Sequence, residues 1–230
     1  MRNEMMHRPV IDHEVLAYLR RGQMPLTGQL GNIEAVARKK GIPIIPAETA
    51  AFISTLFKAL QPQNVLEVGT AIGFSAALML TAMPENGHVT TIDRFPTMQE
   101  RAKANFELLN ISKQVTQLAG DAATILPNLT GIYDVVFMDS AKAKYLDFLS
   151  DCLRLVKQGG VILIDDILQG GTILDSPKTI RHRDHAIHRK LNLLLDYVFR
   201  EEQLQASLLP LGDGLLMITK LTAGPFHIPN

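Results

Sequence analysis

Carboxylates stand where two apolar runs of this sequence end. Asp139 follows the run 134–138, and Asp165 with Asp166 follows the run 161–164. If the two runs form neighbouring parallel strands, their carboxyl ends deliver the three side chains to one edge of a sheet. Three like charges there would repel one another without a cation, and hard oxygen ligands suit Mg²⁺ or Mn²⁺. Each aspartate taken alone is equally compatible with a helix cap or an exposed loop.

Lys142 stands on the same predicted loop as Asp139, three residues further along. Near a divalent cation and partly buried, its pKa is expected to fall, which would make it a general base for a substrate hydroxyl. The alternative is a solvated loop lysine without a chemical role.

A glycine-rich turn lies between the apolar run 65–68 and the helix predicted after it. Gly69 and Gly73 bracket the turn. Glycine lets the backbone approach a ligand closely, and the helix N-terminus offers free amide donors. The spacing is not the G-x-G-x-x-G of a dinucleotide site, and Glu67 would repel a pyrophosphate. An acid there suits a cationic ligand such as S-adenosylmethionine, and a plain tight turn is the alternative.

Two further strand ends bear on the same site. Asp93 ends the second apolar run, where a carboxylate can accept hydrogen bonds from ribose hydroxyls. Gly120, Asp121 and Ala122 follow the third run and would add a contact near an adenine. A glycine turn with one downstream acid is a weak signal, whereas the three strand ends together indicate a nucleoside cofactor.

Basic side chains concentrate after the fifth apolar run, in a sequence whose charge is otherwise balanced. They are Lys178, Arg181, Arg183, Arg189 and Lys190, interspersed with His182, His185 and His188. Such a stretch can contact the phosphates of a nucleic acid. A solvated helix face and a histidine metal site are the alternatives. Because Phe and Tyr are sparse and Trp is absent, the composition gives little support to base stacking.

Apolar runs alternate with helical patterns through the middle of the chain. Strands are predicted at 65–68, 89–92, 115–118, 134–138 and 161–164, and helices at 74–83, 98–109 and 144–156. This alternation predicts an α/β fold with a doubly wound, mostly parallel sheet. A polar stretch at 170–183 and a helix to about residue 199 follow. The last two strands, 206–209 and 215–219, are joined by the close turn Gly212-Asp213-Gly214, so a sheet of seven strands should end with an antiparallel strand.

The first part of the chain reads as amphipathic helices. They are predicted at 11–21, 33–40 and 47–60, and Gly41 followed by Pro43 should end the second. We predict a single domain over residues 1–230, with an N-terminal helical cover at 1–45 and the cofactor-binding and catalytic core at 46–220.

Composition limits the broad class of protein. With 230 residues, 47% of them hydrophobic, the chain can fill one core. The 23 basic and 23 acidic residues balance, so the protein as a whole is no general binder of polyanions. The single cysteine, Cys152, excludes an internal disulfide framework. No apolar run approaches the roughly 20 residues of a membrane span, and we expect a cytoplasmic protein without a membrane partner.

Several segments together resemble the cation-dependent O-methyltransferases of the catechol and caffeoyl-CoA type. They are Val65–Ser75 (VLEVGTAIGFS), Phe137–Lys142 (FMDSAK), Leu163–Asp166 (LIDD) and Gly212–Gly214 (GDG). The resemblance runs from about residue 41 to residue 220. Within the family, the chain is most similar to the bacterial tRNA 5-hydroxyuridine methyltransferases. The segment Ile42-Pro43-Ile44-Ile45 and the basic stretch carry that closer similarity.

The resemblance implies a class I, Rossmann-like methyltransferase fold and a homodimer. It implies that Asp139, Asp165 and Asp166 bind the metal and that Lys142 acts as the base. The implied contacts to S-adenosylmethionine are Ile45, Glu67, Gly69, Thr70, Ser75, Asp93, Gly120, Asp121 and Ala122, with Asp139 near its methionine end. One departure stands out, because the family has Asp-Asn where this chain has Asp165-Asp166. The extra carboxylate either tightens metal binding or leaves Asp166 protonated or outside the first shell of ligands.

Three functions are compatible with these residues. The preferred one is methylation of the 5-hydroxyl of 5-hydroxyuridine in tRNA, which gives 5-methoxyuridine. The second is the same chemistry on a small catechol or phenol. The third is a non-catalytic S-adenosylmethionine-binding or scaffold protein, which would have no need of Lys142 together with three aspartates. The glycine spacing disfavours a nicotinamide dehydrogenase.

Overall fold

The structure is a computed structural model that describes residues 11–229. The first ten residues of the predicted helical cover lie outside the described residues. The chain divides into two compact units. The glycine-loop unit comprises Ala17–Asn128, and the acidic unit comprises the chain up to Leu16 and from Leu129 onward.

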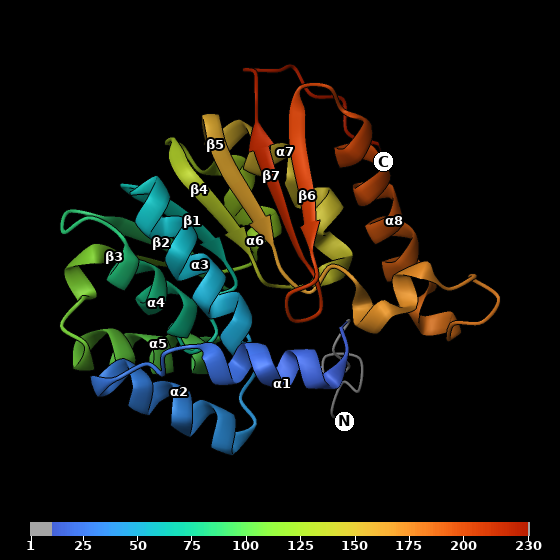
Figure 1. Cartoon of the computed structure of the whole chain (residues 1–230). Helices are drawn as coiled ribbons and strands as arrows, with labels where there is room; N and C mark the ends of the chain where they lie inside the picture. The colour runs from blue at the N-terminus through green and yellow to red at the C-terminus, as the bar shows by residue number, and fades with distance from the viewer. Residues whose placement is uncertain (1–10, 230) are drawn as a thin grey trace. The chain divides into compact units, whose positions relative to one another are not determined.

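The glycine-loop unit combines helices with three parallel strands. Its elements are α1 (His13–Gly22, whose first residues belong to the acidic unit), α2 (Gly28–Lys40), α3 (Ala47–Leu60), β1 (Asn64–Val68), α4 (Phe74–Ala82), β2 (His88–Asp93), α5 (Pro96–Leu108), a 3₁₀ turn (Ser112–Gln114), β3 (Val115–Ala119), α6 (Ala122–Ile125) and a second 3₁₀ turn (Leu126–Asn128). β2 pairs in parallel with β1 on one side and with β3 on the other. Helices α2 and α3 contact α4, as the blue-to-green part of Figure 1 shows.

Local sequence explains where these elements begin and end. Gly41 ends α2 in the left-handed conformation with a φ of 63°, as the sequence predicted. Strand β1 is buried from Val65 to Val68, with Glu67 included, and burial on both faces is typical of a central parallel strand. Helix α4 is buried on nearly every side, and this is why its sequence shows no polar face. In contrast to the predicted start at residue 33, α2 begins at Gly28.

The acidic unit contains the other four strands. Its elements are β4 (Tyr133–Met138), a 3₁₀ turn (Lys142–Lys144), α7 (Tyr145–Leu155), β5 (Val156–Ile164), two 3₁₀ segments (Gln169–Leu174 and His182–Asp184), α8 (His185–Arg200), β6 (Leu204–Leu209) and β7 (Leu215–Lys220). β4 and β5 are parallel, whereas β7 lies antiparallel between β5 and β6. Figure 1 shows α8 beside β6, and α7 contacts both β5 and α8. The predicted hairpin and the antiparallel end of the sheet are confirmed.

Within the glycine-loop unit the strand order is β3-β2-β1, and within the acidic unit it is β4-β5-β7-β6. All strands but β6 and β7 read as parallel runs joined by helical crossovers, and this confirms the predicted doubly wound α/β class. No helix among the described residues is both long and apolar enough to span a membrane.

Lys220 joins the last strand to the end of helix α7. Its Nζ donates to the carbonyl oxygens of Leu153 (2.7 Å) and Val156 (2.9 Å). Only 6% of this residue is exposed, and burial lowers the pKa of its ammonium. A cation is favourable at a helix C-terminus because the last carbonyls have no partner within the helix.

Candidate functional site

The paired ends of β4 and β5 place two of the predicted carboxylates next to each other. Met138 and Ile164 are register partners, and Asp165 N donates to Met138 O at 2.9 Å. Asp139 and Asp165 therefore leave adjacent strands at the same level. Asp166 follows directly, and its amide donates to Asp165 Oδ1 at 2.9 Å.

These carboxylates are close enough to influence one another's ionisation. Burial and the charge of Asp166 raise the pKa of Asp139 to about 7, although Lys142 acts in the opposite direction. Burial, followed by the charges of Asp139 and Asp166, raises the pKa of Asp165 well above its usual range. The structure thus brings together the three predicted metal ligands, of which Asp165 is buried and the other two are half-buried, and we call them the aspartate cluster (Asp139, Asp165 and Asp166).

Lys142 lies against this cluster. Its Nζ is 2.9 Å from Asp213 Oδ2 and 3.4 Å from Asp166 Oδ2. Burial alone would lower the pKa of Lys142, but the carboxylates of Asp166 and Asp213 raise it above its usual range. Without a cation, two carboxylates thus stabilise the ammonium, and the fall of this pKa beside a divalent cation stays a prediction.

Asp213 is a member of the site that the sequence did not single out. It sits in the β6–β7 turn, is 3% exposed, and accepts hydrogen bonds from Lys142 and from the amide of Gly170. The turn is tight against the chain after β5, since a Cβ on Gly214 would collide with the side chain of Leu168. The sequence signal that could have identified Asp213 is its position between two glycines, in the turn of a hairpin that pairs with β5.

The chemistry of the aspartate cluster fits a hard divalent cation. Buried carboxylates that raise one another's pKa are stabilised by a positive charge, and Mg²⁺ prefers such oxygen ligands. Within residues 11–229, however, no three His, Cys, Asp or Glu side chains are already arranged as a metal-binding group. Asp166 instead lies beside Lys142. The metal assignment stays a prediction.

The glycine turn after β1 has the open backbone that the sequence predicted. Gly69 and Gly73 have φ values of 114° and 77°, and even Ala71 is left-handed, with a φ of 44°. A Cβ at Gly73 would lie 2.5 Å from the ring of Phe106, so only glycine fits there. Thr70 is buried and its hydroxyl lies 2.6 Å from that of Thr91.

Glu67 is fully buried at the end of β1. Ser75 Oγ donates to its Oε1 and Thr91 Oγ1 donates to its Oε2, both at 2.5 Å. The structure therefore brings the predicted cofactor residues Glu67 and Ser75 together, and it adds Thr91, which the sequence did not reveal. These hydrogen bonds fix the carboxylate beneath the glycine turn.

The predicted ribose acid, Asp93, is also tied to the turn. Its carboxylate accepts from the amides of Ala71 and Phe95, both at 2.8 Å, and the Asp93 carbonyl accepts from Gly120 N at 2.9 Å. The second and third strand ends therefore meet the first, as the sequence predicted.

The remaining predicted cofactor residues lie on three segments. Asp121 caps α6 by accepting from Ala123 N at 2.9 Å, and Ala122 begins that helix. Ile45 is buried before α3, and its carbonyl accepts from Arg38. Asp139, predicted near the methionine end of the cofactor, belongs to the acidic unit.

The basic stretch leads into α8. Lys178, Arg181, Arg183 and Arg189 are exposed. Arg181 pairs with Asp184 at 2.9 Å, whereas Lys190 pairs with Asp147 at 2.6 Å and is only half-buried. The histidines do not gather as a metal site, because His188 is buried and bonds to the carbonyl of Asp175. The stretch is an exposed basic surface in which Arg181 and Lys190 are ion-paired.

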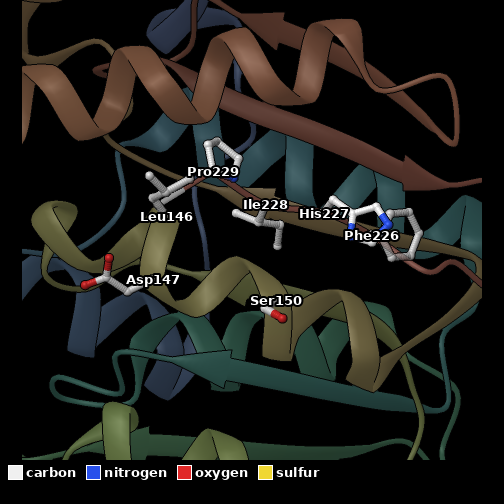
Figure 2. A pocket seen from close by; sticks show the side chains of 7 residues that line it. All are labelled: Leu146, Asp147, Ser150, Phe226, His227, Ile228 and Pro229. Atoms are coloured by element: carbon white, nitrogen blue, oxygen red, sulfur yellow. The ribbon is translucent and has the colours of Figure 1, made fainter.

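An open pocket of about 430 Å³ lies elsewhere in the acidic unit. Figure 2 shows Leu146, Asp147 and Ser150 of α7 facing the C-terminal segment 226–229. It contains none of the predicted catalytic, cofactor or metal residues, so we do not assign the reaction to it.

Comparison with known proteins places the chain in a family of O-methyltransferases. An O-methyltransferase family model matches residues 24–221. The chain is 32% identical over 152 residues to a catechol O-methyltransferase of Niastella koreensis, across 64% of this chain and 68% of that protein. It is 26% identical over 214 residues to tapetum-specific methyltransferase 1 of Arabidopsis thaliana, across 91% of this chain and 88% of the other. The solved O-methyltransferase TomG of Streptomyces achromogenes, in complex with SAM, shares the fold with a TM-score of 0.79 at 21% identity, covering 96% of this chain and 100% of that one.

Proposed function

Since this chain belongs to the O-methyltransferase family, we propose that it transfers the methyl group of S-adenosylmethionine to a hydroxyl oxygen, with the help of a divalent cation. The observation that carries the proposal is the aspartate cluster with Lys142 beside it. A cofactor-binding scaffold has no use for this arrangement, because buried like charges destabilise a protein unless they serve a ligand.

In the proposed reaction, the substrate oxygen forms a bond to the methyl carbon while the carbon–sulfur bond of the sulfonium breaks. The products are a methyl ether and S-adenosylhomocysteine. A divalent cation, when bound, would orient the substrate oxygen and lower the pKa of its hydroxyl. Lys142 is placed to take the proton of the substrate hydroxyl. It must first lose its own proton, which the carboxylates of Asp166 and Asp213 stabilise when no cation is bound. Asp213 holds the Lys142 Nζ in position throughout.

For the substrate we propose 5-hydroxyuridine in tRNA. What supports it is the exposed basic stretch, which a small substrate would not need. The second candidate is a small catechol, favoured by the likeness to the catechol O-methyltransferase of Niastella koreensis.

Cofactor binding is expected to depend on Asp93. The variant Asp93→Ala should weaken S-adenosylmethionine binding by about 1–3 kcal/mol in calorimetry, because hydrogen bonds from the ligand lose a charged acceptor. The same substitution removes the acceptor of Ala71 N, which helps to hold the glycine turn.

The comparison variant is Asp121→Ala, whose carboxylate is also predicted to contact the cofactor but is more exposed, caps the short helix α6 and lies 3.8 Å from Arg94. Its effect on affinity should be smaller. An unchanged affinity of Asp93→Ala for S-adenosylmethionine would exclude Asp93, at the end of β2, from the cofactor site.

Binding of tRNA is expected to depend on the basic stretch. The double variant Arg181→Ala with Arg183→Ala should raise KM for tRNA. It should also reduce the slope of log affinity against log salt, by about one for each phosphate that the variant no longer neutralises. Filter binding across a salt series measures the slope, and cofactor affinity should stay unchanged.

Lys190→Ala serves as the comparison, because this lysine is half-buried and bonds to both carboxylate oxygens of Asp147, whereas Arg181 and Arg183 are exposed, so it should contribute less to phosphate binding. Turnover of a small catechol should not respond to either change. A tRNA affinity that is insensitive both to salt and to the double variant would reduce the stretch to a solvated surface.

A further inference from the structure

Gln169 carries a carboxamide that has no hydrogen-bond partner. The residue is 1% exposed, and neither its Oε1 nor its Nε2 meets a donor or acceptor within the described part of the chain. Buried polar groups are almost always paired, and each unpaired one destabilises the fold because its lost hydration is not replaced. An apolar side chain of similar size would avoid this cost, so the amide does not serve the stability of the fold.

The backbone around Gln169 is held in an uncommon conformation. Gln169 has a φ of 54°, and Gly170 and Gly171 follow with values of 66° and 83°. A left-handed glutamine costs conformational energy that ordinary loops avoid. Side-chain and backbone observations therefore agree that this position is kept for something other than stability.

Contacts to Asp213 fix this segment to the catalytic lysine. Leu168 N donates to Asp213 O at 2.8 Å, and Gly170 N donates to Asp213 Oδ1, on either side of Gln169. The other carboxylate oxygen of Asp213 accepts from Lys142 at 2.9 Å. One aspartate thus positions both Lys142 and the backbone that carries the unpaired amide.

A second unpaired polar atom lies on the neighbouring strand end. Ser140 follows Asp139 directly, and its buried Oγ has no hydrogen-bond partner among the described residues. The loops after β4 and β5, which carry the aspartate cluster, each hold a buried polar side chain that lacks a partner. Such groups are expected where a ligand completes the hydrogen bonds.

We propose that Gln169 is a substrate-recognition residue whose carboxamide forms hydrogen bonds with a donor and an acceptor that lie side by side on the substrate. A carboxamide offers one acceptor oxygen and an NH₂ donor side by side, and this pair complements an amide or imide edge. The uracil ring has such an edge in its ring N–H and carbonyl oxygens, whereas the polar atoms of a catechol are the two hydroxyls that take part in the reaction itself. This inference rests on the proposed methylation of a 5-hydroxyuridine and names the group that selects it.

The test compares two substrates on the same enzyme. The probes are a short synthetic RNA that carries one 5-hydroxyuridine, and catechol, each with S-adenosylmethionine and Mg²⁺. Gln169→Leu should lower kcat/KM for the RNA by about tenfold to a hundredfold, mainly through KM, because the imide edge loses its partner. Turnover of catechol and affinity for S-adenosylhomocysteine should change by less than about twofold.

A stability measurement separates recognition from a structural role. Without substrate, Gln169→Leu should raise Tm by about 2–4 °C, because the desolvation cost of the unpaired amide is removed. An amide that supported the fold would instead lower Tm when replaced. If leucine packs poorly at this position, both measurements are repeated with Gln169→Met, whose side chain is flexible and of similar length.

Each outcome has a defined meaning. Wild-type turnover of catechol alone, or equal losses on both substrates in Gln169→Leu and Gln169→Met, overturns the inference while methyl transfer itself stands. Unchanged RNA turnover in both variants also overturns it. Wild-type turnover of neither probe overturns the proposed function, and the inference with it.

Discussion

Replacement of Lys142 by methionine is expected to slow methyl transfer by about 10²–10⁴-fold, because the substrate hydroxyl loses the group that accepts its proton. Single-turnover kinetics with saturating cofactor would measure this step. The same change leaves Asp213 and Asp166 without their cation in a buried setting, and breaking such a pair destabilises a protein by about 3–5 kcal/mol. A loss of folded protein must therefore be separated from a loss of chemistry.

Lys142→Arg provides that separation. Arginine keeps the positive charge next to Asp166 and Asp213, so the fold should be retained, but a guanidinium does not give up its proton in a protein. We expect a folded variant with normal cofactor affinity and a rate nearly as low as that of Lys142→Met. Retention of more than about a tenth of the wild-type rate by Lys142→Arg would exclude proton transfer to this residue.

Removal of divalent cations is expected to reduce turnover to the background rate, and Mg²⁺ or Mn²⁺ to restore it. The physical reason is that the aspartate cluster gathers negative charge where the substrate oxygen must become an anion. Asp165→Asn, which removes the charge from the most deeply buried member, should raise the cation concentration needed for half-maximal activity. Full turnover in the presence of a chelator would show that the reaction does not need a divalent cation.

Thermal unfolding gives a readout of cation binding that does not depend on activity. Asp139 has its pKa raised to about 7 from 3.8, so the folded protein holds a proton that the unfolded chain has lost, and stability falls as the pH rises through that window. A cation that replaces this proton binds more tightly at high pH, so Mg²⁺ should raise Tm more at about pH 8 than at about pH 5. Asp139→Asn should remove much of that pH dependence.

Most of the fold could be predicted because buried parallel strands leave a strong local signal. The apolar runs of β1, β2 and β4 were located to within a residue or two, and Gly41 marked the end of α2. The start of β5 was missed. Residues 156–160 contain Lys157, Gln158 and two glycines, which have low strand propensity, and of these residues Val156 pairs with Tyr133 of β4 before the register shifts.

The site could be predicted only where its residues end strands. Topology brings strand ends together, so Asp93 and the aspartate cluster were accessible from the sequence. Interactions between residues far apart in the chain were not. Lys142 and Asp213 are 71 residues apart, and their ion pair helps to raise the Lys142 pKa in the absence of a cation. The unpaired state of Gln169 likewise depends on what surrounds it in three dimensions, so no local pattern reveals it.

The position of Asp213 in the β6–β7 turn has a consequence for biosynthesis. A ribosome releases residues 133–170 well before residue 213, so Lys142 emerges without the carboxylate that holds it at 2.9 Å. In a nascent chain that does not yet include the β6–β7 turn, Asp166 is the carboxylate neighbour of Lys142. The amides of Leu168 and Gly170 then lack the oxygen atoms of Asp213 that accept their hydrogen bonds. Domains generally fold from the N-terminal side during synthesis, and here Lys142 is paired by a turn that is made later. The Lys142–Asp213 ion pair can thus form only after the glycine turn and the end of β2 have already been made.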